Sequence, residues 1–207
     1  MRNILITQKV FIDKHGQLNW SLENSWFKYF NKEKINLIPL NFDADNKEKL
    51  LAFKPNGLIL SGGNDLYDKI RLKENLIRDK YEIKLLNLAI KNKIPILAVC
   101  RGFQLVAKFF KSKISKTINH VRSTHVLKIN NKNHGFKIKV LKVNSYHNYA
   151  VNQLPRFFDL IIRCSDNSIE IAKSSKYKIL SFMFHPERKN ISQKQINKIV
   201  FSHFKIK

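Results

Sequence analysis

Short apolar runs alternate with longer amphipathic stretches through the first half of the chain. Aliphatic and β-branched residues dominate residues 4–7, 37–40, 58–60 and 96–99, a composition that predicts β-strands. The last two runs are nearly all apolar, which is typical of strands covered on both faces. Because strands that alternate with helical stretches form parallel sheets, the pattern predicts an α/β fold with a mostly parallel central sheet.

Helical periodicity marks the stretches between and after these runs. Apolar residues recur every three or four positions in residues 21–30 and 74–92, which predicts two helices that face the core. An apolar stretch at residues 103–110 predicts another helix. A last helix is expected at about residues 193–204, with Ser192 as its candidate N-cap.

The hydrophobic pattern changes between residues 121 and 172. Short alternating runs, separated by Asn, Gly, Pro and Ser, predict antiparallel strands that extend the same domain. A final apolar strand at residues 179–184 runs directly into His185. The chain contains no repeat, linker or low-complexity tail, so we expect residues 1–207 to form a single domain.

The amino-acid composition limits the classes of protein to which the chain can belong. Hydrophobic residues make up 43% of the 207 residues, enough for a sizeable core. Lys and Arg total 39 against 15 for Asp and Glu, so the formal net charge is +24 and the protein should attract anions. The basic residues are scattered rather than gathered in blocks, so we expect a solvated basic surface and no nucleic-acid site.

The sequence also carries expectations about location. It has no segment typical of a signal peptide, and no apolar run approaches the roughly 18 residues that span a bilayer, so we expect a soluble protein without membrane contact. The only cysteines, Cys100 and Cys164, are far apart and form no CxxC motif. That usage favours a reducing cytoplasm over a disulfide framework or a zinc site.

The segment IPILAVCRGFQLVAKFF carries the strongest candidate chemistry. It places Cys100 where a buried strand turns sharply into a helix, and Gly102 permits the tight passage. Such a turn raises the side chain above the strand end, where the start of the helix favours a thiolate. A buried structural cysteine is the alternative for Cys100 taken alone.

The segment SFMFHPER supplies partners for this cysteine. His185 and Glu187 follow an apolar strand, with Pro186 holding them in an extended segment. A thiol needs an imidazole to take its proton, and the imidazole needs an acceptor on its other nitrogen, so Cys100, His185 and Glu187 form a candidate triad. Parallel sheets gather the carboxyl ends of distant strands at one edge, which would bring the three together.

CRGFQ and the downstream FHPE together resemble the class I glutamine amidotransferases, especially their γ-glutamyl hydrolase branch. GLILSGGND resembles the oxyanion loop of that family, RDKYEIKLL the helix before its nucleophile strand, VNSYHNYAV its VNSxHHQ-like segment, and CSDNSIEIA its strand pair before HPE. These segments follow the family's order over nearly the whole chain. The resemblance implies a flavodoxin-like three-layer fold with a small antiparallel extension of the sheet.

The resemblance also implies a role for each matching residue. Cys100 would attack the γ-carbonyl, His185 would act as general base and then acid, and Glu187 would hold His185. The backbone N–H groups of Gly63 and Arg101 would form the oxyanion hole, although an ordinary strand-to-loop turn is the alternative reading of the two glycines at 62 and 63. The residues implied around the glutamyl group are Gly62, Gln104, Asn144, Ser145, Tyr146 and His147.

Some features depart from the family pattern. FFKSKISKTINH stands where a Gly-Gly segment usually follows the nucleophile helix, so the loop there should differ. Asn148 replaces the second His of VNSxHHQ, so no role carries over to that position. His120, His125 and His134 have no helical HxxxH spacing and no Cys partner, so we expect them to be surface or loop-supporting histidines and expect no metal or cofactor.

Three functions fit the sequence. The first is a stand-alone hydrolase of a small γ-glutamyl compound; the leaving amine is open among polyamine derivatives, small peptides and a nucleotide amide, from which short family members release cytidine diphosphoramidate for capsule modification. The second is a glutaminase subunit that supplies ammonia to a partner synthase. The third is a basic anion- or nucleic-acid-binding protein with an inactive amidotransferase fold. The intact triad and the lack of a synthetase segment favour the first, and a homodimer is left open.

Overall fold

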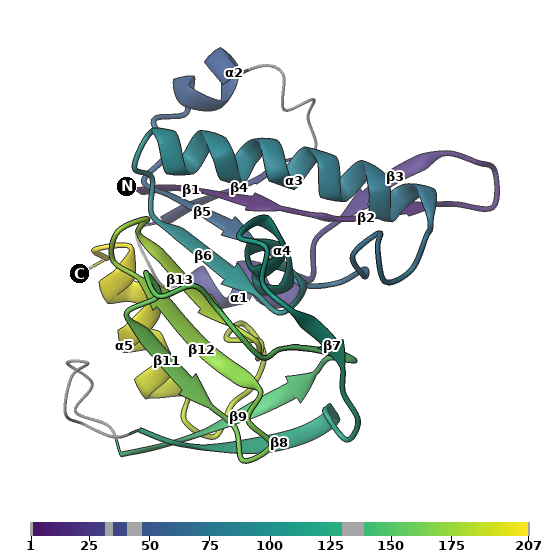
Figure 1. The fold of residues 1–207 in the computed structure, drawn as a ribbon. Helices are drawn as coiled ribbons and strands as arrows, with labels where there is room; N and C mark the ends of the chain where they lie inside the picture. The colour runs from purple at the N-terminus through teal and green to yellow at the C-terminus, as the bar shows by residue number, and fades with distance from the viewer. Residues whose placement is uncertain (1, 32–34, 41–46, 130–138, 207) are drawn as a thin grey trace.

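A seven-stranded sheet forms the centre of the molecule (Figure 1) in the computed structural model, which describes residues 2–31, 35–40, 47–129 and 139–206. The strand order is β11-β12-β13-β6-β5-β1-β4, in which the strands from β13 to β4 are parallel and β12 and β11 are antiparallel to their neighbours. The strand bounds are β1 Arg2–Thr7, β4 Ile35–Leu40, β5 Gly57–Leu60, β6 Ile96–Val99, β11 Leu160–Arg163, β12 Ile169–Ser174 and β13 Ile179–Phe182.

Helices cover both faces of this sheet. Helices α1 (Asn24–Phe30) and α5 (Gln193–His203) pack into one hydrophobic core, and α3 (Lys73–Lys91) and α4 (Arg101–Phe109) pack into the other together with α2 (Lys47–Ala52) (Figure 1). The three layers confirm the predicted α/β class and its mostly parallel sheet. None of the helices in the described ranges is long and apolar enough to cross a bilayer.

The central strands contribute side chains to both hydrophobic cores, because successive side chains of a strand point to opposite faces of the sheet. Ile59 and Leu97 lie in the core under α1 and α5, whereas Leu58, Leu60 and Ala98 lie in the core under α3 and α4. All of these side chains are at most 3% exposed. This double burial is why the strands at residues 58–60 and 96–99 could be predicted from nearly uninterrupted apolar runs.

The final strand ends earlier than the pattern predicted. β13 stops at Phe182, which pairs with Val99 at the end of β6, whereas the apolar run continues to Phe184. The Cys100 N–H donates to the Phe182 carbonyl, after which the chain turns into α4 and gives β13 no further partner. Apolarity alone does not reveal this end, because Met183 and Phe184 remain fully buried outside the strand.

A β-hairpin occupies part of the region predicted as the first helix. The prediction of a helix over residues 21–30 is wrong at its start, since Ser21 ends β3 (Leu18–Ser21), which pairs antiparallel with β2 (Lys9–Ile12). Asp13 closes the turn by accepting hydrogen bonds from the N–H groups of His15 and Gln17, both at 2.9 Å. Neither this hairpin nor α2 was predicted from the sequence.

Some antiparallel strands in the second half of the chain belong to the central sheet, and the others form separate two-stranded pairs. β11 and β12 extend the central sheet, while β8 (Val121–Lys128) and β9 (Val140–Tyr146) pair with each other beside it. A third pair joins β7 (Ile114–Lys116) to β10 (Tyr149–Val151). The β8–β9 pair packs Leu127, Leu141 and Val143 into the core under α1 and α5, so it is fixed against the sheet although it is not part of it.

Candidate active site

Cys100 lies at a strained turn between β6 and α4. Its backbone has φ 52° and ψ −108°, a left-handed region that a residue with a side chain seldom adopts. Gly102 permits the turn because a Cβ at that position would collide with the Leu60 carbonyl oxygen of β5. The strand, sharp turn and helix predicted from the sequence are therefore confirmed, and the turn holds the cysteine at the carboxyl edge of the sheet.

His185 and Glu187 follow β13, the parallel neighbour of β6. The Nδ1 atom of His185 lies 2.7 Å from Oε1 of Glu187, and the two residues are 3% and 8% exposed. Since Phe182 pairs with Val99, the residues that follow the two strands reach the same edge of the sheet. The structure thus brings the predicted base and its carboxylate to the edge that carries Cys100.

Cys100 and His185 meet beside Gly62. The side chain of Cys100 is one of the influences that raise the pKa of His185. A Cβ on Gly62 would lie 2.6 Å from Cε1 of His185 and 3.4 Å from both Nε2 of His185 and Cβ of Cys100. Any larger residue at position 62 would therefore displace the imidazole, which explains why glycine stands there. The ring of His185 lies between sulfur and carboxylate, the arrangement that a cysteine nucleophile requires.

The surroundings of His185 favour its charged form. Burial disfavours the imidazolium, but the adjacent Glu187 carboxylate and Cys100 sulfur outweigh burial and raise the pKa of His185 to about 10. A protonated imidazole beside a sulfur stabilises a thiolate. The same ring can then return its proton to a leaving group.

Asn144 on β9 fixes the backbone of His185. Its Nδ2 donates to the His185 carbonyl at 2.8 Å, and its Oδ1 accepts the His185 N–H at 2.9 Å. Asn190 donates to the same carbonyl at 2.9 Å and accepts the Asn144 N–H at 2.8 Å.

Ser192 precedes α5 as expected, but its hydroxyl accepts the Lys142 N–H of β9 at 2.9 Å and makes no side-chain cap.

Most residues that the resemblance placed around the glutamyl group have partners inside the protein. Ser145 is fully buried and donates to the His120 carbonyl, and Gln104 donates to the Tyr149 carbonyl. Tyr146 is 43% exposed, and Gly62 lines the pocket. The Tyr146 ring lies edge-on to the imidazole of His185, with centroids 6.1 Å apart. Substrate contact by these side chains stays a prediction.

A buried ion network holds the loop that contains Gly62 and Gly63. Arg78 of α3 donates to the carbonyls of Ser61 and Gly63 and pairs with Glu82, its neighbour one helical turn later. Gly63 has φ +79°, which favours glycine. The backbone N–H of Arg101 belongs to the first turn of α4, where N–H groups have no partner within the helix. An oxyanion hole formed by Gly63 and Arg101 stays a prediction.

The same network anchors the side chain of Arg101. Its guanidinium forms ion pairs with Asp79 and Glu82, away from the pocket. Burial would raise the pKa of Glu82, but Arg101 and Arg78 overcome burial and lower it. Burial, opposed by Glu82, lowers the pKa of Arg78 to about 10, so Arg78 stays charged at neutral pH. Neither Arg78 nor Glu82 was predicted to support the site, although charges four residues apart in an otherwise core-facing helix could have indicated a buried pair.

A pocket of about 290 Å³ opens beside the triad. Its walls come from the β2–β3 hairpin, α1, the 61–63 loop and the segment after β13. Two cations face it: Lys9, and Arg188, which pairs with Glu23 at 2.7 Å and stacks 4.8 Å from the Tyr146 ring centroid. The lining residues are Lys9, Ser21, Leu22, Glu23, Trp26, Ser61, Gly62, Gly63, His185, Glu187 and Arg188.

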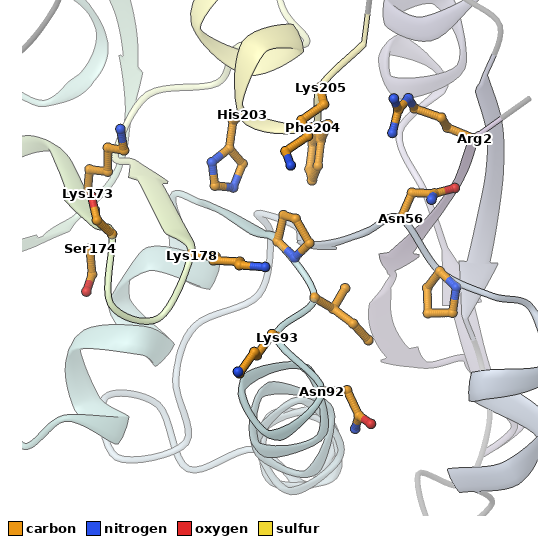
Figure 2. A pocket seen from close by; sticks show the side chains of 14 residues that line it. Arg2, Asn56, Asn92, Lys93, Lys173, Ser174, Lys178, His203, Phe204 and Lys205 are labelled. Atoms are coloured by element: carbon orange, nitrogen blue, oxygen red, sulfur yellow. The ribbon is translucent and has the colours of Figure 1, made fainter.

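A larger cavity of about 490 Å³ lies at the opposite edge of the sheet, near the beginnings of β5, β6 and β13. Figure 2 shows Lys178 and His203 on one side of it and Arg2 and Asn56 on the other. Its lining is strongly basic but includes neither His185 nor Glu187, and β6 separates it from Cys100. Size therefore does not identify the reactive site in this molecule.

Two histidines expected at the surface are buried. His120 and His125 are 5% and 7% exposed, and they lie against His147 and Glu170. The surface prediction is wrong for both, because the β8–β9 pair folds against β12 and encloses their rings. His134 lies outside the residues that the structure describes.

Comparison with known proteins agrees with this geometry. Residues 10–205 match the family model for glutamine amidotransferase class-I. The chain is 34% identical to a γ-glutamyl-CDP-amidate hydrolase from Campylobacter jejuni subsp. jejuni serotype O:2, over 97% of this chain and 98% of that protein. It is 30% identical to a glutamine-hydrolyzing GMP synthase subunit from Pyrococcus furiosus, over 68% and 70% of the two chains.

A solved structure supports the fold independently. A glutamine amidotransferase from Thermotoga maritima superposes with a TM-score of 0.63 at 17% identity, covering 99% of this chain and 84% of that one. The family match covers nearly the whole chain, including β6, the turn at Cys100 and the segment after β13. The chain therefore belongs to the class-I glutamine amidotransferase family.

Proposed function

We propose that this protein hydrolyses the amide bond of a small γ-glutamyl compound through a glutamyl-thioester on Cys100, and that its substrate is γ-glutamyl-CDP-amidate. The observation that carries the proposal is the meeting of Cys100 with the imidazole of His185 at the open edge of the sheet, with Glu187 behind the ring. Near full-length similarity to the Campylobacter jejuni hydrolase supports the choice of substrate.

The first half-reaction forms the thioester. The sulfur of Cys100 attacks the γ-carbonyl carbon, and the carbonyl electrons move onto oxygen. The N–H groups of Gly63 and Arg101 stabilise that oxyanion. When the C–N bond breaks, His185 gives its proton to the departing nitrogen, so the amidate leaves neutral at that atom and the glutamyl group remains on sulfur.

The second half-reaction returns the enzyme to its starting state. His185, now neutral, takes a proton from water, and the resulting hydroxide attacks the thioester carbonyl. The C–S bond breaks, glutamate leaves, and the sulfur is again a thiolate beside an imidazolium. Glu187 keeps the Nδ1 side of the ring occupied throughout, so Nε2 carries every proton transfer.

An anionic leaving group suits the charge of the whole chain rather than that of the pocket wall, where Lys9 and Arg188 are balanced by Glu23 and Glu187. The formal charge of +24 would draw a nucleotide conjugate toward the site. The pocket volume of about 290 Å³ suits the glutamyl end of such a substrate. The nucleotide would then extend toward the solvent-facing rim.

A glutaminase that supplies ammonia to a partner synthase is the second candidate. Its support is the 30% identity to the GMP synthase subunit of Pyrococcus furiosus, which extends over 68% of this chain rather than nearly all of it. The two candidates differ in what the isolated protein consumes. A stand-alone hydrolase needs no partner, whereas a synthase subunit is expected to hydrolyse glutamine when its partner binds.

The test is an assay of purified protein on γ-glutamyl-CDP-amidate and on glutamine, with glutamate and the released amine measured by mass spectrometry. We expect turnover of the nucleotide conjugate with a kcat/KM at least about 100-fold above that for glutamine, since uniform contacts to the cytidine diphosphate moiety add binding energy. Turnover of glutamine alone, appearing when a partner synthase is added, would support the second candidate. Turnover of neither substrate would overturn the proposed hydrolase.

A further inference from the structure

Four buried side chains from separate parts of the chain converge away from the triad. His120 precedes β8, His125 lies on β8, His147 follows β9 and Glu170 lies on β12. One nitrogen or oxygen from each lies within 4.8 Å of the others, and all four residues are at most 7% exposed. None of the four lines the pocket beside Cys100.

The spacing of these atoms matches the ligand shell of a small cation. Nδ1 of His120 and Nε2 of His147 are 3.3 Å apart, and the latter is 3.5 Å from Oε1 of Glu170. Nδ1 of His125 lies 2.9 Å from the same oxygen. Ligands about 2.0 Å from a tetrahedral zinc ion are separated by about 3.3 Å, which these three distances approach. The remaining pairs lie within 4.8 Å and would close further around an ion.

The outward nitrogens of the three rings are already occupied. Nε2 of His120 lies 2.7 Å from Asp166 Oδ2, and Nδ1 of His147 lies 3.0 Å from the Tyr149 carbonyl. Nε2 of His125 lies 3.4 Å from the Ser123 hydroxyl. A ring that donates its outer N–H to such a partner presents an unprotonated inner nitrogen, which is how histidines that bind metals are oriented.

Glu170 provides an independent sign of a missing partner. Its carboxylate is fully buried, and its Oε2 has no hydrogen-bond partner among the described residues. A buried carboxylate oxygen without a partner is costly, and a cation at the centre of the cluster would compensate it.

We propose that His120, His125, His147 and Glu170 bind a divalent transition-metal ion, with zinc as the best fit. Imidazole and carboxylate suit zinc, and four protein ligands close a tetrahedral shell, which is the mark of a structural rather than a catalytic ion. The ion joins the β8–β9 pair to β12 of the central sheet. It also steadies β9, whose Asn144 holds the backbone of His185.

The test uses the Cys100→Ser protein, because a catalytic thiolate beside His185 would itself attract zinc. After dialysis against a chelator, the protein is titrated with Zn²⁺ by calorimetry and with Co²⁺ by visible absorption, and its melting temperature is recorded with and without Zn²⁺. We expect one ion per chain, the intense visible bands of tetrahedral Co²⁺, and a higher melting temperature with Zn²⁺.

Matched variants assign the ion to this cluster. Adding Glu170→Gln, which keeps the size of the side chain, or His125→Ala should weaken Zn²⁺ binding by at least about 100-fold and remove the Co²⁺ bands. His203→Gln, a change at a histidine on the far edge of the sheet, should leave both unchanged. If Glu170→Gln binds Zn²⁺ as tightly as its parent, or if the parent shows neither Co²⁺ bands nor a thermal shift, the proposal is overturned.

Discussion

In the part of the chain that the structure describes, two buried groups bring histidine together with glutamate. In the triad, Nδ1 of His185 lies 2.7 Å from Glu187, and the other side of the ring faces Cys100 beside a pocket. In the second group, the rings of His120, His125 and His147 surround Glu170, and their outer nitrogens face partners within the protein. Both groups combine histidine with glutamate. The group that faces the second nitrogen of the imidazole therefore decides whether the histidine transfers protons or binds at a structural centre.

The two groups also differ in the strands that carry them. The triad follows β6 and β13, parallel neighbours whose ends coincide at one edge of the sheet. The histidine group joins β8, which lies outside the central sheet, to β12 within it. A parallel sheet thus presents a reactive edge, while the antiparallel additions form an enclosed support for it.

Removing the nucleophile should produce the largest change. We expect Cys100→Ala to lower kcat by about 10⁴-fold or more, because without sulfur no thioester forms. Steady-state assay of glutamate release measures this change. Cys164→Ala is the matched control, since Cys164 is the other free cysteine and lies outside the pocket; a comparable loss there would show that thiol chemistry is not localised at Cys100.

Removing the carboxylate from the triad should have the next largest effect. In Glu187→Gln we expect kcat to fall roughly 10²- to 10⁴-fold, because the ring loses the acceptor that orients it. The pKa of His185 should fall well below its present value of about 10, since Glu187 is the strongest influence that raises it. A pH titration of the His185 ring by NMR measures that shift, and an unchanged pKa would refute the assigned pairing.

Loosening the support of His185 should cost less. Asn144→Ala removes two hydrogen bonds to the His185 backbone. We expect the free energy of unfolding to fall by about 2–3 kcal/mol, and kcat to fall about tenfold with KM little changed. Thermal denaturation and steady-state kinetics measure both. Asn87→Ala, which removes an exposed helix amide on α3, is the control, and a loss confined to KM would argue that Asn144 binds substrate instead.

His203, a histidine with no carboxylate partner among the described residues, gives the smallest expected effect. Burial, opposed by a hydrogen bond to the Ile96 carbonyl, lowers the pKa of His203 from 6.5 to about 4. The unfolded chain therefore takes up a proton first, so stability present above pH 6.5 is lost as the pH falls toward 4.

Replacing this ring should reduce that acid sensitivity. Between pH 7 and pH 5, we expect His203→Gln to lose roughly 1–2 kcal/mol less unfolding free energy than the parent, after allowing for partial exposure of the ring. Urea denaturation at the two pH values measures the difference. His15→Gln, on the exposed turn of the β2–β3 hairpin, is the control. Equal acid sensitivity in the parent and His203→Gln would contradict the assignment.

The elements that could be predicted from the sequence are those marked by a short, continuous stretch of residues. The strand before Cys100 is apolar because both of its faces are buried, and Gly102, His185 and Glu187 stand in short motifs that could be read directly. The predicted helix began too early because Leu22, which lies between β3 and α1, continues the helical spacing of Trp26 and Phe30.

Groups assembled over long distances could not be predicted in the same way. His125 and Glu170 are 45 residues apart, and only the packing of the β8–β9 pair against β12 brings them together. Arg78 contacts the loop at Gly63 because α3 lies beside β5, a relation that depends on topology rather than on spacing. Lys9 and Arg188 likewise reach one pocket from opposite ends of the chain.

Trapping the covalent intermediate tests the central claim most directly. The protein is mixed with γ-glutamyl-CDP-amidate, quenched in acid within the first turnover, digested and examined by mass spectrometry. We predict a glutamyl group on the peptide that contains Cys100, absent from Cys100→Ala. Rapid substrate cleavage with no such adduct, together with undiminished cleavage by Cys100→Ala, would contradict the thioester mechanism.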